Sequence, residues 1–168
     1  LEYPLRWTQE PVRYLGIKIH SDPEIVLKEN YGIVIQKLSD TVDRWIKLPL
    51  SLCGRIALMK MVVLSLFLFL FLNIPIPLPK TFFDWLRSLL VRPAWAGKTP
   101  RVSWRVLTLP YNKGGLNAPD MEAYNRAAQG MFVHYWIHSP NDLPHLQIER
   151  EAALPKTLPE VLFSPSAQ

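Results

Sequence analysis

The feature that most constrains this chain is one long apolar stretch, residues 45–79, which reads WIKLPLSLCGRIALMKMVVLSLFLFLFLNIPIPLP. A proline precedes Ser51, which can cap a new helix. Nineteen residues, 61–79, carry no charge, and a membrane span needs about 20 apolar residues. The three prolines at the end of the stretch must stop the helix near Asn73, which leaves about 12 apolar residues. We therefore expect a core helix over residues 52–72, and the prolines argue against a membrane span.

A second helix is predicted before this stretch. Asp22 can cap its start and Pro23 suits the first helical position. Apolar residues then recur at steps of three and four as far as Ile46, which predicts one buried face over about six turns. The residues of this face are Leu27, Tyr31, Val34, Leu38, Val42 and Trp45.

The remaining elements are a short strand and two further helices. Residues 12–19 read VRYLGIKI, which predicts a strand bent at its central glycine and paired with an upstream segment or with residues 5–7. A third helix over residues 79–91 should end before Pro93. A fourth should begin near Asp120 and bury Tyr124, Ala127, Ala128, Met131, Tyr135 and His138. The chain is expected to be mainly α, with about four helices in a bundle preceded by a short β-strand or hairpin.

Charge is distributed unevenly along the chain. From Arg44 to Lys113 there are eleven basic residues and one acidic residue, a net charge of +10, whereas the rest of the chain carries −5. A basic middle between acidic flanks is typical of a surface that binds a polyanion, and its plainer interpretation is a solvated helix face. The single cysteine, Cys53, excludes an internal disulfide framework, so we expect an intracellular protein of the cytoplasm or nucleus.

Several kinds of chemistry find no support in the sequence. No pair of adjacent aspartates could hold the two metal ions of a polymerase, and the glycine pair at 114–115 lacks the residues of a phosphate-binding loop. His134 and His138 have a spacing that can bind zinc, but no cysteine pair or intervening glutamate pattern accompanies them. We therefore expect no catalytic residues, no metal site and no cofactor in this chain.

The predicted helix over residues 52–72 carries two basic residues, Arg55 and Lys60. Arg55 and Lys60 are five residues apart, so they point about 140° apart and cannot both face one straight ligand. We expect Arg55 to contact nucleic acid, because Gly54 beside it would let a phosphate backbone come close and the helix N-terminus adds its positive end. The other residue should meet a carbonyl, a carboxylate or solvent.

The motifs also follow one another in a familiar order. They are YLGI at 14–17, Asn30-Tyr31, Trp45, LPLSLCGRIALMKM at 48–61, IPIPLP at 74–79, Phe82-Phe83, Trp95 with Gly97-Lys98 and Pro100-Arg101, GGL at 114–116, Pro119-Asp120, and Tyr124 with Ala127-Ala128-Gln129. This order resembles the region just after the palm in the reverse transcriptases of non-LTR (LINE-type) retrotransposons. The resemblance covers roughly residues 12–137.

The resemblance implies a domain organisation and a role. Residues 1–20 would be the end of the palm with the primer-grip strand, residues 21–92 a helical thumb and residues 93–138 a connector with one helix. Residues 139–168 lie beyond the resemblance, and their repeated prolines predict a proline-rich tail or the truncated start of the next region. The thumb would hold an RNA–DNA or DNA duplex against a palm that this chain lacks. The paired aspartates and their Mg²⁺ would belong to that missing palm, so the chain alone should not be an enzyme. It begins at Leu1 and is expected to be a fragment of a longer polyprotein.

The same resemblance assigns residues to the nucleic-acid surface. Tyr14, Leu15 and Gly16 would lie at the primer grip, Gly54, Arg55 and Lys60 on the thumb, and Lys98 and Arg101 near the connector path. The basic segment adds Arg44, Lys47 and Arg105 to the predicted contacts.

Two alternatives remain open at this stage. The apolar segment 61–72 with its basic flank could insert in a membrane or dock to a partner protein. The chain also departs from the family at Ser65, Leu66, Phe69 and Pro93-Ala94, which looks like drift in a copy no longer under selection. In such a relic Phe67, Phe69 and Phe71 would lack partners and form an aggregation-prone patch.

Overall fold

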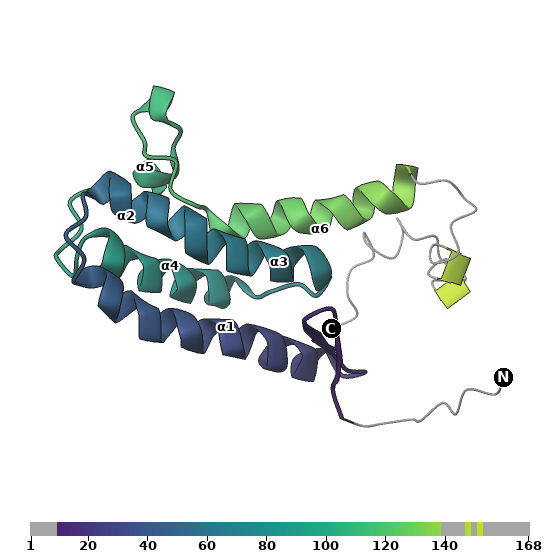
Figure 1. The fold of residues 1–168 in the computed structure, drawn as a ribbon. Helices are drawn as coiled ribbons and strands as arrows, with labels where there is room; N and C mark the ends of the chain where they lie inside the picture. The colour runs from purple at the N-terminus through teal and green to yellow at the C-terminus, as the bar shows by residue number, and fades with distance from the viewer. Residues whose placement is uncertain (1–9, 139–146, 149–150, 153–168) are drawn as a thin grey trace. The chain divides into compact units, whose positions relative to one another are not determined.

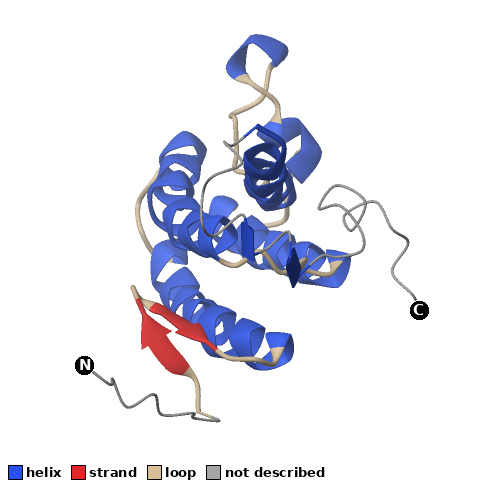
Figure 2. Ribbon diagram, turned by 90° about the vertical axis from the view of Figure 1, so that its right-hand side faces the viewer, coloured by secondary structure: helices blue, strands red, loops and turns tan. Residues whose placement is uncertain are grey.

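The computed structural model describes residues 10–138, 147–148 and 151–152, and the chain forms two compact units, residues 1–125 and 126–168. The chain is mainly helical, with a two-stranded hairpin before the helices, as predicted (Figures 1 and 2). The predicted strand partner at residues 5–7 lies outside the described residues, as does most of the predicted tail. The division into palm, thumb, connector and tail segments stays a prediction.

The hairpin corrects the sequence-based prediction of one bent strand. Strand β1, Val12–Tyr14, pairs antiparallel with β2, Ile17–Ile19, so the stretch folds back on itself and supplies its own partner. Leu15 and Gly16 form the turn, with φ angles of 46° and 92°. Positive φ at both positions of a two-residue loop matches the twist of the two strands, and glycine adopts that conformation without steric cost.

Helix α1, Pro23–Ile46, begins and ends where its sequence predicted. The Asp22 carboxylate accepts a hydrogen bond of 2.9 Å from the backbone N–H of Glu24, which satisfies one of the free donors at the helix start. Of the six residues predicted on its apolar face, four are buried: Tyr31, Leu38, Val42 and Trp45. Leu27 and Val34 are half-buried, and the buried Asn30 was not predicted.

The long apolar stretch forms one continuous helix with a wide turn inside it. Helix α2, Leu52–Met59, passes through a π-helical segment η1, Lys60–Leu64, into α3, Ser65–Asn73, where the prolines end it as predicted. The π turn was not predicted. By length and composition alone this helix could cross a membrane.

Two further helices complete the first unit, together with a 3-10 segment and the start of α6. Helix α4 runs over Lys80–Ala94, α5 over Trp104–Thr108 and the 3-10 segment η2 over Tyr111–Lys113. The predicted stop before Pro93 is wrong, because the residue lies in the last turn of α4 and the helix ends only at Ala94. Gly115 passes so close to the backbone of Leu109 that a Cβ atom would overlap the carbonyl group. A glycine at this place in the GGL motif is therefore required by space.

Helix α6, Met121–His138, has the predicted start but a different buried face. The Asp120 carboxylate caps it by accepting a hydrogen bond of 3.1 Å from the N–H of Ala123. Of the predicted face only Ala128 is buried, while Tyr124, Met131, Tyr135, Ala127 and His138 are exposed. The buried stripe is instead Met121, Asn125 and Ala128, one residue further along the chain or about 100° around the helix.

The core of the first unit lies where α1, α4 and the α2–α3 helix pack side by side (Figure 1). Tyr31 lies 6.4 Å from the rings of Phe67 and Phe71, measured between centroids, and 5.8 Å from Phe82. Phe67 and Phe71 are fully buried, so two of the three phenylalanines that a relic would leave without partners pack in this core. Phe69 is the exception, with 45% of its surface exposed.

The Tyr31 hydroxyl leads to a prediction. It is buried and makes no hydrogen bond with the described residues, so Tyr31→Phe should raise the free energy of unfolding by about 1 kcal/mol in denaturant titrations at neutral pH.

Burial also raises the pKa of Tyr31 well above its ordinary value, because the phenolate would lose its hydration. Above about pH 10 the tyrosine ionises in the unfolded chain but stays neutral in the folded protein, so the free energy of unfolding falls as pH rises above that value. The phenylalanine variant should lose less stability between about pH 9 and 11, and an equal loss in both proteins would contradict this prediction.

Candidate nucleic-acid interface

Arg55 joins three parts of the chain at one end of the helical bundle. Its guanidinium group donates hydrogen bonds to four backbone carbonyl groups, at 2.7 to 3.2 Å. The acceptors are the carbonyl oxygens of Trp45, Leu48, Leu50 and Pro93. They lie at the C-terminal end of α1, in the connection to α2 and in the last turn of α4. Carbonyls at helix C-termini lack partners within the helix, and those of Trp45 and Pro93 accept from the arginine in addition to a backbone N–H of the turn that follows.

This geometry corrects the prediction that Arg55 contacts nucleic acid. The side chain is only 8% exposed, and Nε and both terminal nitrogens are already engaged by carbonyl groups. Gly54 is half-buried, and a Cβ atom at this residue would lie at ordinary contact distance, 3.5 to 3.8 Å, from Leu50 and Ser51. Arg55 therefore supports the surface from within.

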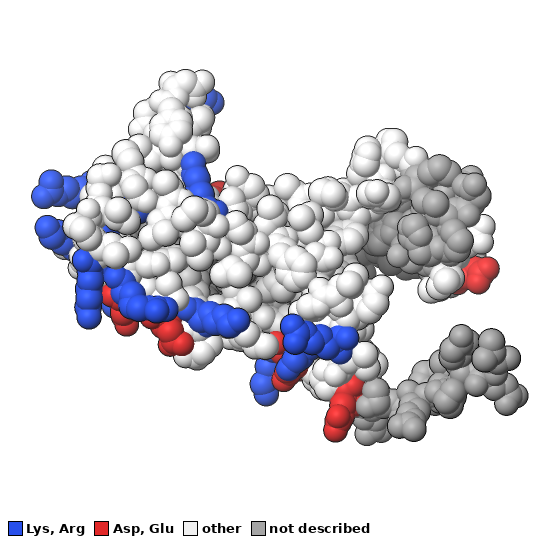
Figure 3. Space-filling view, viewed as in Figure 1, with Lys and Arg blue, Asp and Glu red and all other residues white. Residues whose placement is uncertain are grey.

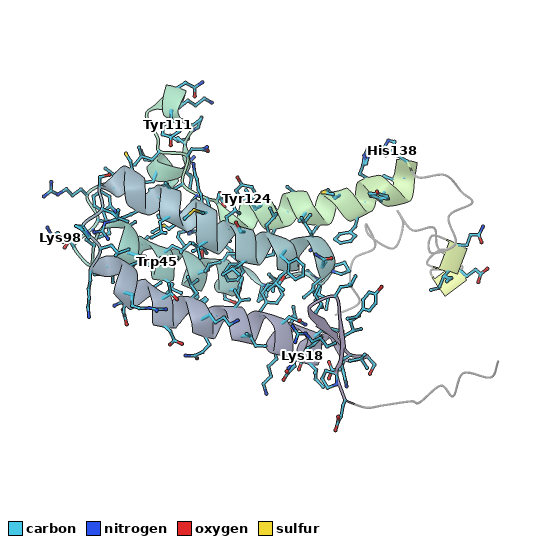
Figure 4. The ribbon with its side chains drawn as sticks, viewed as in Figure 1. Lys18, Trp45, Lys98, Tyr111, Tyr124 and His138 are labelled. Atoms are coloured by element: carbon cyan, nitrogen blue, oxygen red, sulfur yellow. The ribbon has the colours of Figure 1, made fainter. Side chains whose placement is uncertain are left out.

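Exposed basic residues surround this buried arginine. We call Arg44, Lys47, Arg92, Lys98 and Arg101 the basic end, and all five are exposed. The tertiary structure brings the two stretches that carry them together, since Arg92 pairs with Asp43 and a Cβ atom on Gly97 would lie 3.5 Å from the side chain of Ile46. Figures 3 and 4 show Lys and Arg side chains at this end of the bundle, with Lys98 at the extremity.

The basic residues of this end differ in how freely they could meet a ligand. Arg92 donates to the Asp43 carboxylate at 3.3 Å, and Arg44 donates to the Thr41 hydroxyl at 3.1 Å. Lys47, Lys98 and Arg101 form no ion pair with another described residue. Arg92 was not predicted as a contact, and only its place just before Pro93 in a basic segment could have suggested it.

Lys60 and Arg105 belong to a different part of the surface. Lys60 lies over the ring of Tyr111, with its Nζ atom 5.8 Å from the ring centroid, and the ring is 68% exposed. The prediction that Arg55 and Lys60 point in different directions is confirmed. Arg105 is exposed on the short helix α5, whose loop extends away from α2 (Figure 1).

The hairpin holds the remaining predicted contacts, Tyr14 and Gly16. Asn30 of α1 anchors it: the Asn30 side chain accepts from the N–H of Lys18 at 2.9 Å and donates to the Lys18 carbonyl at 2.8 Å. Lys18 also forms an ion pair with Glu29, and its hydrogen bond and charge lower the pKa of that carboxyl group. From Asn30 to Ile46 a helix rises about 24 Å, so the hairpin and the basic end are distant from each other.

Leu15 at the tip of the hairpin gives a second prediction. Its side chain is 80% exposed and its φ of 46° costs a leucine about 1 kcal/mol, which asparagine largely avoids. Leu15→Asn should therefore raise the stability of the hairpin, measured as slower amide exchange at Tyr14 and Ile17, the pair that flanks the turn. Leu15→Ala keeps the unfavourable backbone and serves as the control. Equal exchange rates in the two variants would show that the turn carries no such strain.

The described residues contain no group of three or more His, Cys, Asp and Glu side chains that could hold a metal ion. His134 and His138 stack on each other with ring centroids 4.2 Å apart. A search of known protein-family models found none that matches this chain.

Proposed function

We propose that this chain is the thumb and the beginning of the connector of a LINE-type RNA-directed DNA polymerase, and that it grips a primer–template duplex. The observation that supports the proposal is the basic end, where five exposed cations from two stretches of the chain, residues 44–47 and 92–101, accompany one buried arginine. Cations spaced over a rigid helical end can meet successive phosphates of a duplex without reading its sequence.

The proposed division of labour leaves the chemistry to another domain. The chain would hold the duplex, and the missing palm of the same polyprotein would supply the aspartates and bind Mg²⁺. We expect no polymerisation by this chain alone. Within a cell the duplex and the palm would meet it in the cytoplasm or nucleus.

The test is the salt dependence of duplex binding. Fluorescence anisotropy with a labelled RNA–DNA hybrid gives the affinity at each salt concentration. Arg92 is paired with Asp43, so four cations of the basic end remain to meet one phosphate each. The plot of log affinity against log salt concentration should then have a slope of about −3.6. DNA duplex of the same sequence should bind with a similar slope, because backbone contacts do not distinguish bases. A slope near zero on the hybrid would overturn the proposal.

A further inference from the structure

A surface groove runs along the first unit between α1 and the α2–α3 helix and reaches the basic end at Arg44. It consists of two adjoining hollows of about 500 and 370 Å³ that share Lys37 and Leu66 in their walls. Its apolar side chains include Ile33, Leu66 and Phe69, which are 40 to 47% exposed. Apolar groups that remain this exposed along one continuous groove are typical of a docking surface.

The two walls of the groove have the spacing of helix faces. On α1 the lining residues fall at steps of four, three and four, namely Val34, Leu38, Thr41 and Trp45. On the facing helix Val62, Leu66 and Phe69 follow at steps of four and three, with Leu70 beside Phe69. Two such stripes on neighbouring helices form a channel parallel to both axes, which is the shape that one more helix of a bundle fills.

The charges along the groove are mainly positive. Arg13, Lys18, Lys37 and Arg44 line it, against the two carboxylates of Glu29 and Asp40. Lys18 is neutralised by Glu29, whereas Arg13 and Lys37 form no ion pair with another described residue. An occupant with carboxylates at its edges would pair with these cations, and the rim thereby selects the sign of the partner's charge.

We propose that this groove binds an amphipathic α-helix of a partner protein that has an apolar face and acidic flanks. The apolar face would lie on Leu66, Phe69 and Ile33, with the acidic flanks beside Lys37 and Arg13. The lining from Asn30 to Trp45 corresponds to about 23 Å, so a helix of about 16 residues covers it. The proposal does not depend on duplex binding at the basic end.

Other occupants fit the groove less well. A nucleic acid would place phosphates over the apolar floor, where they would lose hydration without gaining hydrogen bonds. A second copy of this chain would bring the same basic rim against itself in a two-fold dimer, and like charges would face each other. The basic rim does attract anionic lipid, but a groove recessed between two helices offers a flat membrane little contact.

The experiment uses the full chain and a synthetic helical peptide of about 16 residues, with leucines at helical spacing and glutamates on both flanks. A matched peptide carries lysines in place of the glutamates. Fluorescence anisotropy should show binding of the acidic peptide and at least tenfold weaker binding of the basic one, an effect about as large as that of a central interface residue. Phe69→Glu should lower the affinity for the acidic peptide by about tenfold or more. Met61→Glu, an exposed apolar residue of the same helix outside the groove, should not weaken it.

Lys37→Glu provides a second variant that does not depend on the apolar floor. It should weaken binding of the acidic peptide and strengthen binding of the basic peptide. Lys28, which is exposed on α1 outside the groove, provides the control, and Lys28→Glu should change the binding of neither peptide. The proposal is overturned if the two peptides bind equally or not at all. It is also overturned if Phe69→Glu abolishes a dimer seen by light scattering, flotation with anionic vesicles, or binding of the RNA–DNA hybrid, since the groove would then serve that occupant.

Discussion

Replacing Arg55 with alanine is expected to lower the free energy of unfolding by about 4 kcal/mol, the largest single effect we predict in this chain. The guanidinium group is the shared partner of four carbonyl groups, and three of them come from α1 and the connection that follows it. Without it, the Leu50 carbonyl has no donor among the described residues, and the Trp45, Leu48 and Pro93 carbonyls keep only backbone N–H donors, at 2.8 to 3.3 Å. Hydrogen bonds from a charged donor contribute about 1.5–3 kcal/mol each, and the retained donors offset part of that loss. Chemical denaturation followed by circular dichroism measures the loss.

Two further variants separate this role from a general effect of charge. Arg55→Lys keeps the charge but has a single ammonium group, which cannot reach four acceptors in the plane of a guanidinium. Its free energy of unfolding should therefore fall by more than half of the decrease expected for Arg55→Ala. It also keeps the prediction testable if the alanine variant does not fold. Arg101→Ala removes an exposed arginine of the basic end and should change stability by less than about 0.5 kcal/mol. Equal stabilities for the wild type and Arg55→Lys would refute the four-carbonyl role.

Removing two lysines of the basic end is expected to weaken duplex binding by about fiftyfold at about 0.1 M salt. The double variant Lys47→Ala with Lys98→Ala loses two exposed cations whose neighbours in the chain, Ile46 and Gly97, lie so close that a Cβ atom on Gly97 would be 3.5 Å from the Ile46 side chain. Each phosphate contact contributes about 0.9 to the log–log salt slope, so the slope should become about 1.8 less steep. Anisotropy titrations with the RNA–DNA hybrid at several salt concentrations measure both quantities.

The control has the same change in net charge at different places. Lys28→Ala with Lys80→Ala removes two exposed lysines, one near the N-terminus of α1 and one at the N-terminus of α4. The basic end lies at the opposite, C-terminal ends of these two helices. If binding depends only on net charge, both double variants will weaken it equally. That result would mean that the basic end is not the site.

Much of the secondary structure could be predicted from the sequence because its boundaries rest on local interactions. Asp22, Ser51 and Asp120 each accept a hydrogen bond from a backbone N–H of the first turn that follows, and the proline run after Asn73 removes the donors that a helix needs. The apolar face of α1 followed for the same reason, since its period is that of the helix itself. The groove and the basic end could not be predicted in this way, because their residues come from segments far apart in the sequence.

The failures of prediction share one cause. The angle between Arg55 and Lys60 followed from helix geometry, but which of them is buried depends on where the carbonyls of Trp45 and Pro93 come to lie. The buried face of α6 and the partner of β1 likewise depend on which surfaces pack, and a period of 3.6 or 2 residues does not specify the neighbour. The sequence alone determined where α1 begins and ends, where α2 and α6 begin and where α3 ends, and the concentration of charge in the middle of the chain. Only the tertiary structure decided which cations reach solvent, because burial of a charged group depends on the acceptors that distant segments bring to it.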